Sequence, residues 1–123
     1  MTRLLFDEFS KNLLEGLLSN GGTVQQGFTI ASEVKEVDIL FQPDPGASNT
    51  LHSLGLLGRM AAKFCLIEPY RNPVSPADIR ACLNRTIEVE LLQRREAKQN
   101  KIPPKQIVLP DLWILSPTAS RSV

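Results

Sequence analysis

The sequence is poor in the residue types from which many active sites are built. Its 123 residues include one histidine, one tryptophan, one tyrosine and two cysteines. The cysteines, Cys65 and Cys82, have no CxxC spacing and no neighbouring histidine, so the sequence does not favour a zinc site or a redox pair. We expect both to be buried free thiols. The single histidine, His52, lies beside a loop, and we interpret it as a surface residue rather than a ligand.

Other absences exclude whole classes of protein. No apolar run approaches the roughly 20 residues that cross a membrane, and the N-terminus becomes acidic at Asp7, too early for a secretory signal. The net charge of +1 excludes a strong general attraction to nucleic acid, so any basic surface must be local. There is no internal repeat, glycine-rich phosphate loop or nucleophile elbow. We therefore expect a cytoplasmic protein with no membrane partner and no identified small-molecule substrate.

What the sequence does contain is a pattern of helix, three strands, helix and strand within one domain spanning residues 1–123. The second helix has the clearest start, Ser75-Pro76-Ala77-Asp78, which is typical of a capped helix with proline in its first turn. The expected helices cover residues 3–19 and 76–99. The expected strands cover residues 23–32, 33–41 and 63–70, with further strand material at 106–109 and 112–115. Residues 43–62 form an insert with a short helix, and residues 116–123 form a frayed tail.

This order predicts an α/β fold, or an α+β mixed sheet, in which the first two strands form a hairpin. The fourth strand is expected to run parallel to the third, because a long helix connects them. Apolar periodicity predicts the buried faces of the two long helices. On the first helix the stripe comprises Leu5, Phe9, Leu13 and Leu17, widened by Phe6, Leu14 and Leu18. On the second helix it comprises Ile79, Cys82, Leu83, Thr86, Ile87 and Leu91.

Two acidic residues lie within the expected central strands. Asp38 stands in Glu36-Val37-Asp38-Ile39-Leu40-Phe41, where alternation places Val37, Ile39 and Phe41 on one face and the acids on the other. Glu68 ends the run Phe64-Cys65-Leu66-Ile67-Glu68, whose continuous apolar character predicts burial on both faces. A buried carboxylate must be neutral, paired or holding a cation. Carboxylates from neighbouring strands are suitable ligands for Mg²⁺ or Mn²⁺.

With these residues on these strands, the sequence resembles the PD-(D/E)XK nuclease superfamily, especially compact nucleases related to transposases and recombination-promoting proteins. It resembles still more a group of uncharacterised cyanobacterial proteins that carry E-[IV]-D-[IV] followed by [FI]-E-P-[FY]-R-N-P. The resemblance covers about residues 4–117. The similar chains continue past the last residue of this one, so one interpretation of this chain is a fragment of a longer protein. The resemblance implies a restriction-endonuclease-like αβββαβ core.

The resemblance also implies a site and a reaction, the metal-dependent hydrolysis of DNA phosphodiesters. Asp38 and Glu68 would hold Mg²⁺ or Mn²⁺, with Glu36 as a further or alternative ligand. The lysine that follows the glutamate by two positions in the family is replaced here by Tyr70, which is a poor base at neutral pH. Arg71 comes next and could stabilise phosphate charge. The first helix of the family often adds an acid, for which Asp7, Glu8 and Glu15 are the candidates.

Two alternatives to an active nuclease stay open at this stage. The first is a non-catalytic binding or assembly domain that kept the fold, with DNA or a second copy of the chain as candidate partners. The second is a structural network in which Asp38 and Glu68 pair with Arg71, Arg80 or Lys35. If only the lysine is missing, Tyr70→Lys is expected to raise nuclease activity.

Overall fold

The fold was obtained as a computed structural model, which describes the backbone of residues 2–30 and 35–117 and the side chains of residues 8–29 and 36–117. Its long helices are α1 (Thr2–Leu18) and α4 (Pro76–Gln99). Short helical segments are α2 (Ser48–His52), α3 (Leu56–Met60) and the 3₁₀ turn η1 (Pro104–Gln106). The strands are β1 (Gly22–Ile30), β2 (Lys35–Pro43), β3 (Cys65–Pro69) and β4 (Asp111–Leu115). The part of the frayed-tail prediction that concerns residues 118–123 lies outside the described residues.

The four strands form one mixed sheet in the order β1-β2-β3-β4. The first two pairings are antiparallel and the β3–β4 pairing is parallel. The predicted mixed α/β class, the pairing of the first two strands and the parallel fourth strand are therefore confirmed. Of the two stretches predicted as strand near the C-terminus, only the second forms a strand, because residues 106–109 do not join the sheet. None of the helices in the described part of the chain is both long and apolar enough to cross a membrane.

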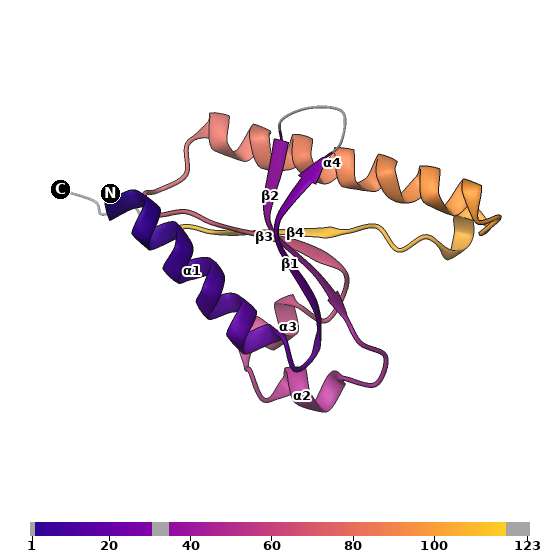
Figure 1. Cartoon of the computed structure of the whole chain (residues 1–123), viewed down its shortest axis with the longest axis horizontal. Helices are drawn as coiled ribbons and strands as arrows, with labels where there is room; N and C mark the ends of the chain where they lie inside the picture. The colour runs from indigo at the N-terminus through magenta and orange to yellow at the C-terminus, as the bar shows by residue number, and fades with distance from the viewer. Residues whose placement is uncertain (1, 31–34, 118–123) are drawn as a thin grey trace.

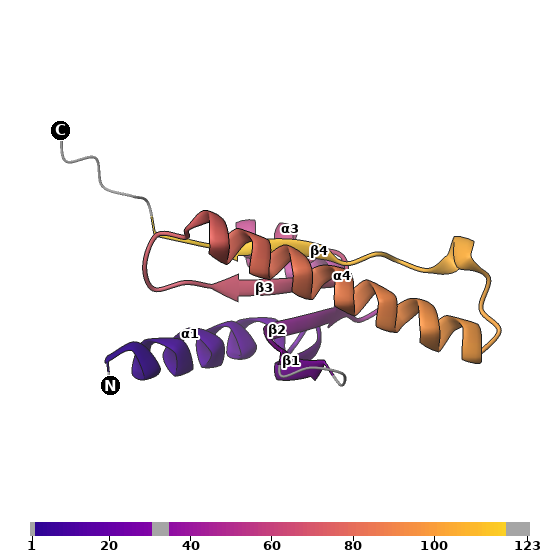
Figure 2. The ribbon, with the colours of Figure 1, turned by 90° about the horizontal axis from the view of Figure 1, so that it is seen from above.

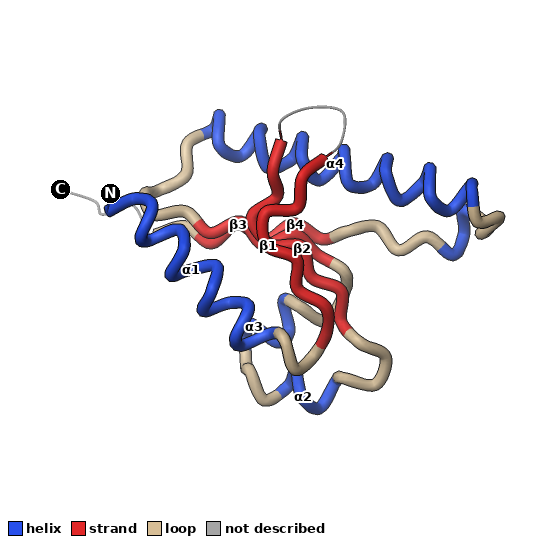
Figure 3. The backbone as a smooth tube through the Cα atoms, in the orientation of Figure 1, coloured by secondary structure: helices blue, strands red, loops and turns tan. Residues whose placement is uncertain are grey.

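Helices cover both faces of the sheet, as Figures 1 and 3 show. On one face α1 and the insert helices enclose Ile39, Phe41, Cys65 and Ile67. On the other face α4 lies across the strands, and its C-terminal half extends past them (Figure 2). Val89 of α4 packs there against Val37, Leu40 and Leu66. β3 is thus buried on both sides, as its apolar run predicts.

The apolar faces of β2 differ from the predicted alternation. Val37 belongs to the α4 side, whereas Ile39 and Phe41 belong to the α1 side. The change occurs opposite Gly27, whose φ of +63° is the left-handed conformation that glycine adopts without a Cβ clash. Gly27 and Asp38 are also the one step missing from the β1–β2 register. A local kink of this kind re-aims side chains, and here it falls at the residue predicted to be functional.

The predicted faces of both long helices are wrong in part. On α1, Leu14 and Leu18 are buried, but Phe9, Leu13 and Leu17 are exposed. On α4, the buried side is formed by Cys82, Val89 and Ala97. Four residues of the apolar face predicted for this helix are exposed instead: Ile79, Leu83, Ile87 and Leu91. Periodicity detects an apolar face, but it does not determine whether the rest of the chain covers that face.

Local signals were better guides to where elements begin and bend. α4 starts with a complete capping box, in which the Ser75 hydroxyl accepts from the Asp78 backbone N–H and the Asp78 carboxylate accepts from the Ser75 N–H. The insert contains two short helices rather than one. They pack closely, because Gly58 of α3 lies directly against the backbone carbonyl of Leu51.

Candidate functional site

The site begins where β2 and β3 stop pairing. The β2–β3 register ends at Ile39–Ile67, so Asp38 and Glu68 lie one step beyond the last pair. The Glu68 side chain occupies this gap and is wholly buried. Its Oε2 atom accepts a hydrogen bond of 3.0 Å from the Asp38 backbone N–H, which the ladder no longer uses. The Glu68 side chain therefore continues the hydrogen bonding between β2 and β3 one step beyond their last paired residues.

The other oxygen of Glu68 is held by α4. Arg85 donates from Nε to Glu68 Oε1 at 2.6 Å, and the arginine side chain is itself largely buried, with 19% of its surface exposed. A charge-assisted hydrogen bond of this length is among the stronger polar contacts in proteins. Both carboxylate oxygens of Glu68 thus have protein donors, one from β2 and one from α4.

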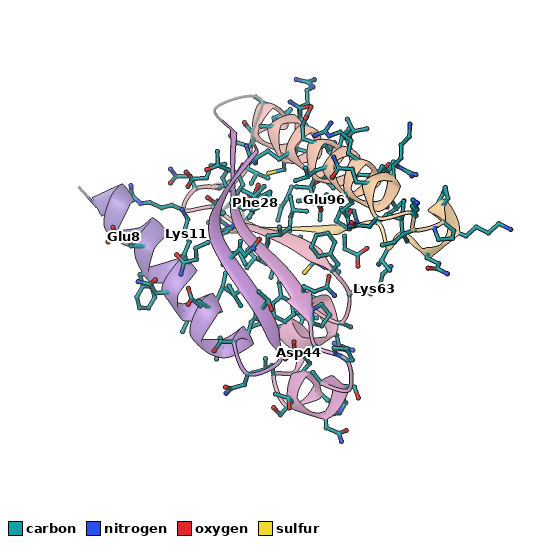
Figure 4. The ribbon with its side chains drawn as sticks, turned by 45° about the vertical axis from the view of Figure 1, so that its right-hand side comes forward. Glu8, Lys11, Phe28, Asp44, Lys63 and Glu96 are labelled. Atoms are coloured by element: carbon teal, nitrogen blue, oxygen red, sulfur yellow. The ribbon has the colours of Figure 1, made fainter. Side chains whose placement is uncertain are left out.

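Asp38 is held from the opposite layer. Its Oδ1 lies 3.3 Å from Lys11 Nζ of α1, and 31% of the Asp38 side-chain surface is exposed. Figure 4 shows Lys11 on α1 beside the strands. The two carboxylates lie close enough for the Asp38 charge to raise the pKa of Glu68. Each acid has its own cation, Lys11 for Asp38 and Arg85 for Glu68, so the pair is neutralised within the chain.

Tyr70 and Cys82 extend the network along α4. The Tyr70 hydroxyl lies 3.1 Å from Cys82 Sγ and 3.5 Å from Arg85 Nη2, which also donates to Cys82 Sγ at 3.4 Å. Burial raises the pKa of both the Tyr70 hydroxyl and the Cys82 thiol, so both groups are protonated at neutral pH. Tyr70 is therefore a fixed packing and hydrogen-bonding partner of Arg85, and not a base.

Both cysteines are free and buried, as predicted. Burial and the charge of Asp111 raise the pKa of the Cys65 thiol to about 12. Since the thiolate is the reactive form, neither thiol is prepared for nucleophilic chemistry.

The remaining predicted site residues do not join this network in the described structure. Glu36 is exposed and pairs with Thr29 in the β1–β2 register. Arg71 is exposed in the turn after β3. Of the first-helix acids, Glu8 is exposed and Glu15 accepts a hydrogen bond from Gln26. The side chains of Asp7 and Lys35 lie outside the described residues.

The two cations that pair with the acids were not predicted from the sequence. Arg71 and Arg80 were predicted as partners for the acids, whereas the described side chains give these roles to Arg85 and Lys11; the predicted partner Lys35 lies outside the described side chains. One signal was available for Arg85, because it follows Cys82 by one helical turn and so shares the buried side of α4. The buried Glu68 was expected to be neutral, paired or holding a cation, and the crossing of α4 over β3 determines that Arg85 reaches it.

Three of the four carboxylate oxygens of Asp38 and Glu68 are engaged within the chain. Mg²⁺ and Mn²⁺ need free carboxylate oxygens, whereas Arg85 and the Asp38 N–H hold those of Glu68 and Lys11 holds Asp38 Oδ1. Among the side chains that the structure describes, no three acidic, histidine or cysteine residues group in a way that could hold a metal ion. The donor set instead suits an internal ion-pair network.

The network makes a prediction for the pH dependence of stability. Burial, and next the Asp38 charge, raise the pKa of Glu68 from 4.5 to about 7, against the lowering effect of Arg85. The folded state then binds a proton more tightly than the unfolded state does. Proton binding by Glu68 therefore stabilises the folded state. This contribution to the free energy of unfolding is fully present below about pH 4.5 and is lost as the pH rises through about 7.

We therefore expect the free energy of unfolding to fall by about 1–3 kcal/mol between pH 5 and pH 8. Glu68→Gln cannot titrate and should remove most of this slope. Urea unfolding of both proteins across that range measures the difference. Parallel pH profiles for the two proteins would show that Glu68 does not carry the dependence.

Comparisons of the chain with models of protein families, with curated proteins and with solved structures found no match. The resemblance to the nuclease superfamily therefore stays a prediction from the sequence. What the structure adds is the arrangement of Asp38 and Glu68: two strand carboxylates, each paired with a cation from a different helix.

Proposed function

We propose that this chain is a nuclease-like domain that has lost metal-dependent hydrolysis and acts by binding. The observation that carries the proposal is the buried ion pair of Arg85 with Glu68. A metal-dependent phosphodiesterase needs carboxylates that can hold the cation and that the phosphate can approach. Glu68 is wholly buried and its oxygens are engaged, so the guanidinium takes the place of a metal as the counter-charge.

The element order supports the nuclease-like part of the proposal. The order of a first helix, three antiparallel strands with two short helices before the third, a long helix and a parallel fourth strand is compatible with the αβββαβ core that the resemblance implies. Tyr70 supports the loss of hydrolysis, because it replaces the expected lysine and is fixed beside Arg85 by its hydroxyl group.

DNA is the binding partner that the charge distribution favours. Five exposed basic residues lie at the end of α4 and in the segment that follows, here called the basic cluster: Arg94, Arg95, Lys98, Lys101 and Lys105. Glu96 is the only acid within residues 94–105, although the whole chain carries a net charge of only +1. Positive charge is thus concentrated at one end of the molecule, as expected for a surface that contacts phosphates.

The experiment measures DNA binding and DNA cleavage in the same protein. Fluorescence anisotropy with a short duplex should show binding that weakens steeply with salt. Reversing two charges of the basic cluster, Arg95→Glu with Lys98→Glu, should reduce the affinity at least about tenfold and flatten the salt dependence. The matched control is Arg59→Glu on α3, an exposed arginine outside the cluster, which should bind nearly as well as the wild type.

Supercoiled plasmid incubated with the wild type and Mn²⁺ should stay intact. Cleavage that disappears in Asp38→Ala would overturn the loss of hydrolysis. Absence of salt-dependent binding, or equal losses in the cluster and control variants, would overturn DNA as the partner.

A metal-dependent nuclease is the second candidate, and Lys11 is the observation that favours it. Its ammonium group lies 3.3 Å from Asp38 Oδ1, so α1 brings a lysine to the carboxylates from which the strand lysine is missing. Asp38 is also the more exposed of the two acids. Plasmid cleavage that requires both Asp38 and Lys11, tested with Asp38→Ala and Lys11→Met, would establish this candidate instead.

A further inference from the structure

The outward side of α4 carries a continuous apolar stripe that the described part of the chain leaves open. Ile79, Leu83, Ile87 and Leu91 recur every four residues and are 39%, 50%, 54% and 43% exposed. The neighbouring side of the helix packs on the sheet through Val89, and Cys82 is buried on that side. We call these four residues the α4 stripe. Residues spaced by four form one ridge of a helix, which is the feature that packs against a second helix.

We propose that the α4 stripe binds the same stripe of a second copy of this chain, with the two helices antiparallel about a twofold axis. Such an interface is self-complementary, because each contact occurs twice. With the axis midway along the stripe, Ile79 of one copy meets Leu91 of the other and Leu83 meets Ile87. All four apolar residues are then covered, and the antiparallel arrangement opposes the two helix dipoles.

Charges along the helix select this register over its neighbours. In the centred register Arg80 of one copy lies opposite Glu90 of the other, and the pair forms twice. Glu90 is accessible for this contact, since its own salt bridge to Arg94 is partly exposed. A register displaced by one turn towards the C-terminus would centre on Ile87 and place Arg80 opposite Arg94, with repulsion at both ends. A displacement in the other direction would leave Leu91 without an apolar partner. Complementary flanking charges set register in paired helices generally.

This interface goes beyond the proposed function and does not depend on it. It uses the side of α4 away from Glu68 and Arg85, so the ion-pair network is unchanged by pairing. Two of the five residues of the basic cluster, Arg94 and Arg95, lie just past the stripe, and a dimer would present two such clusters.

Sedimentation of the whole chain over a range of concentrations tests the proposal. The wild type should sediment as a monomer–dimer equilibrium, and Leu83→Glu should raise the dimer dissociation constant about 100-fold or more, because it buries two unpaired charges per dimer. The matched control is Leu13→Glu on α1. Leu13 is also 50% exposed and belongs to an apolar stripe with four-residue spacing, but it lies outside the proposed interface and should leave the constant unchanged.

Charge reversal tests the register without altering the apolar contacts. Arg80→Glu alone and Glu90→Arg alone should each weaken the dimer about tenfold, and the double variant should recover close to wild-type affinity, because it restores both pairs. Circular dichroism confirms that each variant is folded. A wild type that stays monomeric at all concentrations, or a dimer that Leu13→Glu disrupts and Leu83→Glu does not, would overturn the proposal. Failure of the double variant to recover affinity would overturn the register.

Discussion

Replacing Arg85 by methionine is expected to lower the free energy of unfolding by about 3–5 kcal/mol at pH 8. Methionine keeps most of the length of the side chain but removes the donor to Glu68 Oε1, which is wholly buried. Removing one partner of a buried ion pair leaves an uncompensated charge, and this costs far more than the pair itself contributes. The loss should be smaller at pH 5, where the carboxyl can take up a proton.

Two further variants separate the charge from the packing. Glu68→Gln combined with Arg85→Met removes both charges and should recover much of the lost stability. Arg95→Met is the matched control, because this arginine is exposed on the same helix and its loss should change stability by no more than about 0.5 kcal/mol. Urea unfolding at the two pH values measures all four proteins. An Arg85→Met protein as stable as Arg95→Met would mean that Glu68 has no need of the guanidinium.

Replacing Gly58 by alanine is expected to destabilise the chain by about 3 kcal/mol. A Cβ at this position of α3 would overlap the backbone carbonyl oxygen of Leu51, and backbone cannot rotate away as a side chain can. Leu51 belongs to the core on the α1 side of the sheet, so the strain would reach Ile39 and Phe41. Overpacking of a tight contact costs about 1–3 kcal/mol, and more where the backbone must move.

Gly16→Ala is the control with the opposite sign. Gly16 lies within α1, and a Cβ there would meet no atom within 4 Å. Alanine should therefore stabilise the chain by up to about 1 kcal/mol through helix propensity. Thermal unfolding of the two variants should move in opposite directions from the wild type. A neutral Gly58→Ala would show that α2 and α3 pack less closely than described.

The predictable parts of this fold are those determined by short stretches of sequence. The capping box at Ser75 needs only four residues, and both of its hydrogen bonds are present. The apolar run of β3 predicted a doubly buried strand, and its acid, expected to be neutral, paired or holding a cation, is paired with Arg85. The parallel β4 followed from the length of the connection through α4.

The parts that could not be predicted depend on how distant elements cross. Val37 and Ile39 lie on opposite faces because the hairpin kinks at Gly27, and alternation alone cannot locate such a kink. Leu83 and Val89 are both apolar residues of α4, yet only Val89 meets the sheet. Arg85 is one of several arginines on that helix, and it became the partner of Glu68 through the position of α4 over β3.

The position of Tyr70 beside Arg85 changes the result expected for Tyr70→Lys. The Tyr70 hydroxyl lies 3.5 Å from Arg85 Nη2, so a lysine there would place a second cation beside the guanidinium. Restoring the motif lysine alone should therefore not restore a nuclease site. Arg85 would also have to be replaced, so that Glu68 is released.

Calorimetric titration of Mn²⁺ into the wild type and into Arg85→Ser tests the central claim most directly. If Arg85 is the resident counter-charge of Glu68, the wild type should show no binding that depends on the carboxylates. Arg85→Ser should gain a Mn²⁺ site that Asp38→Ala then abolishes, because the freed acids can serve as oxygen ligands. Wild-type binding of Mn²⁺ that is lost in Asp38→Ala and in Glu68→Gln would contradict the account.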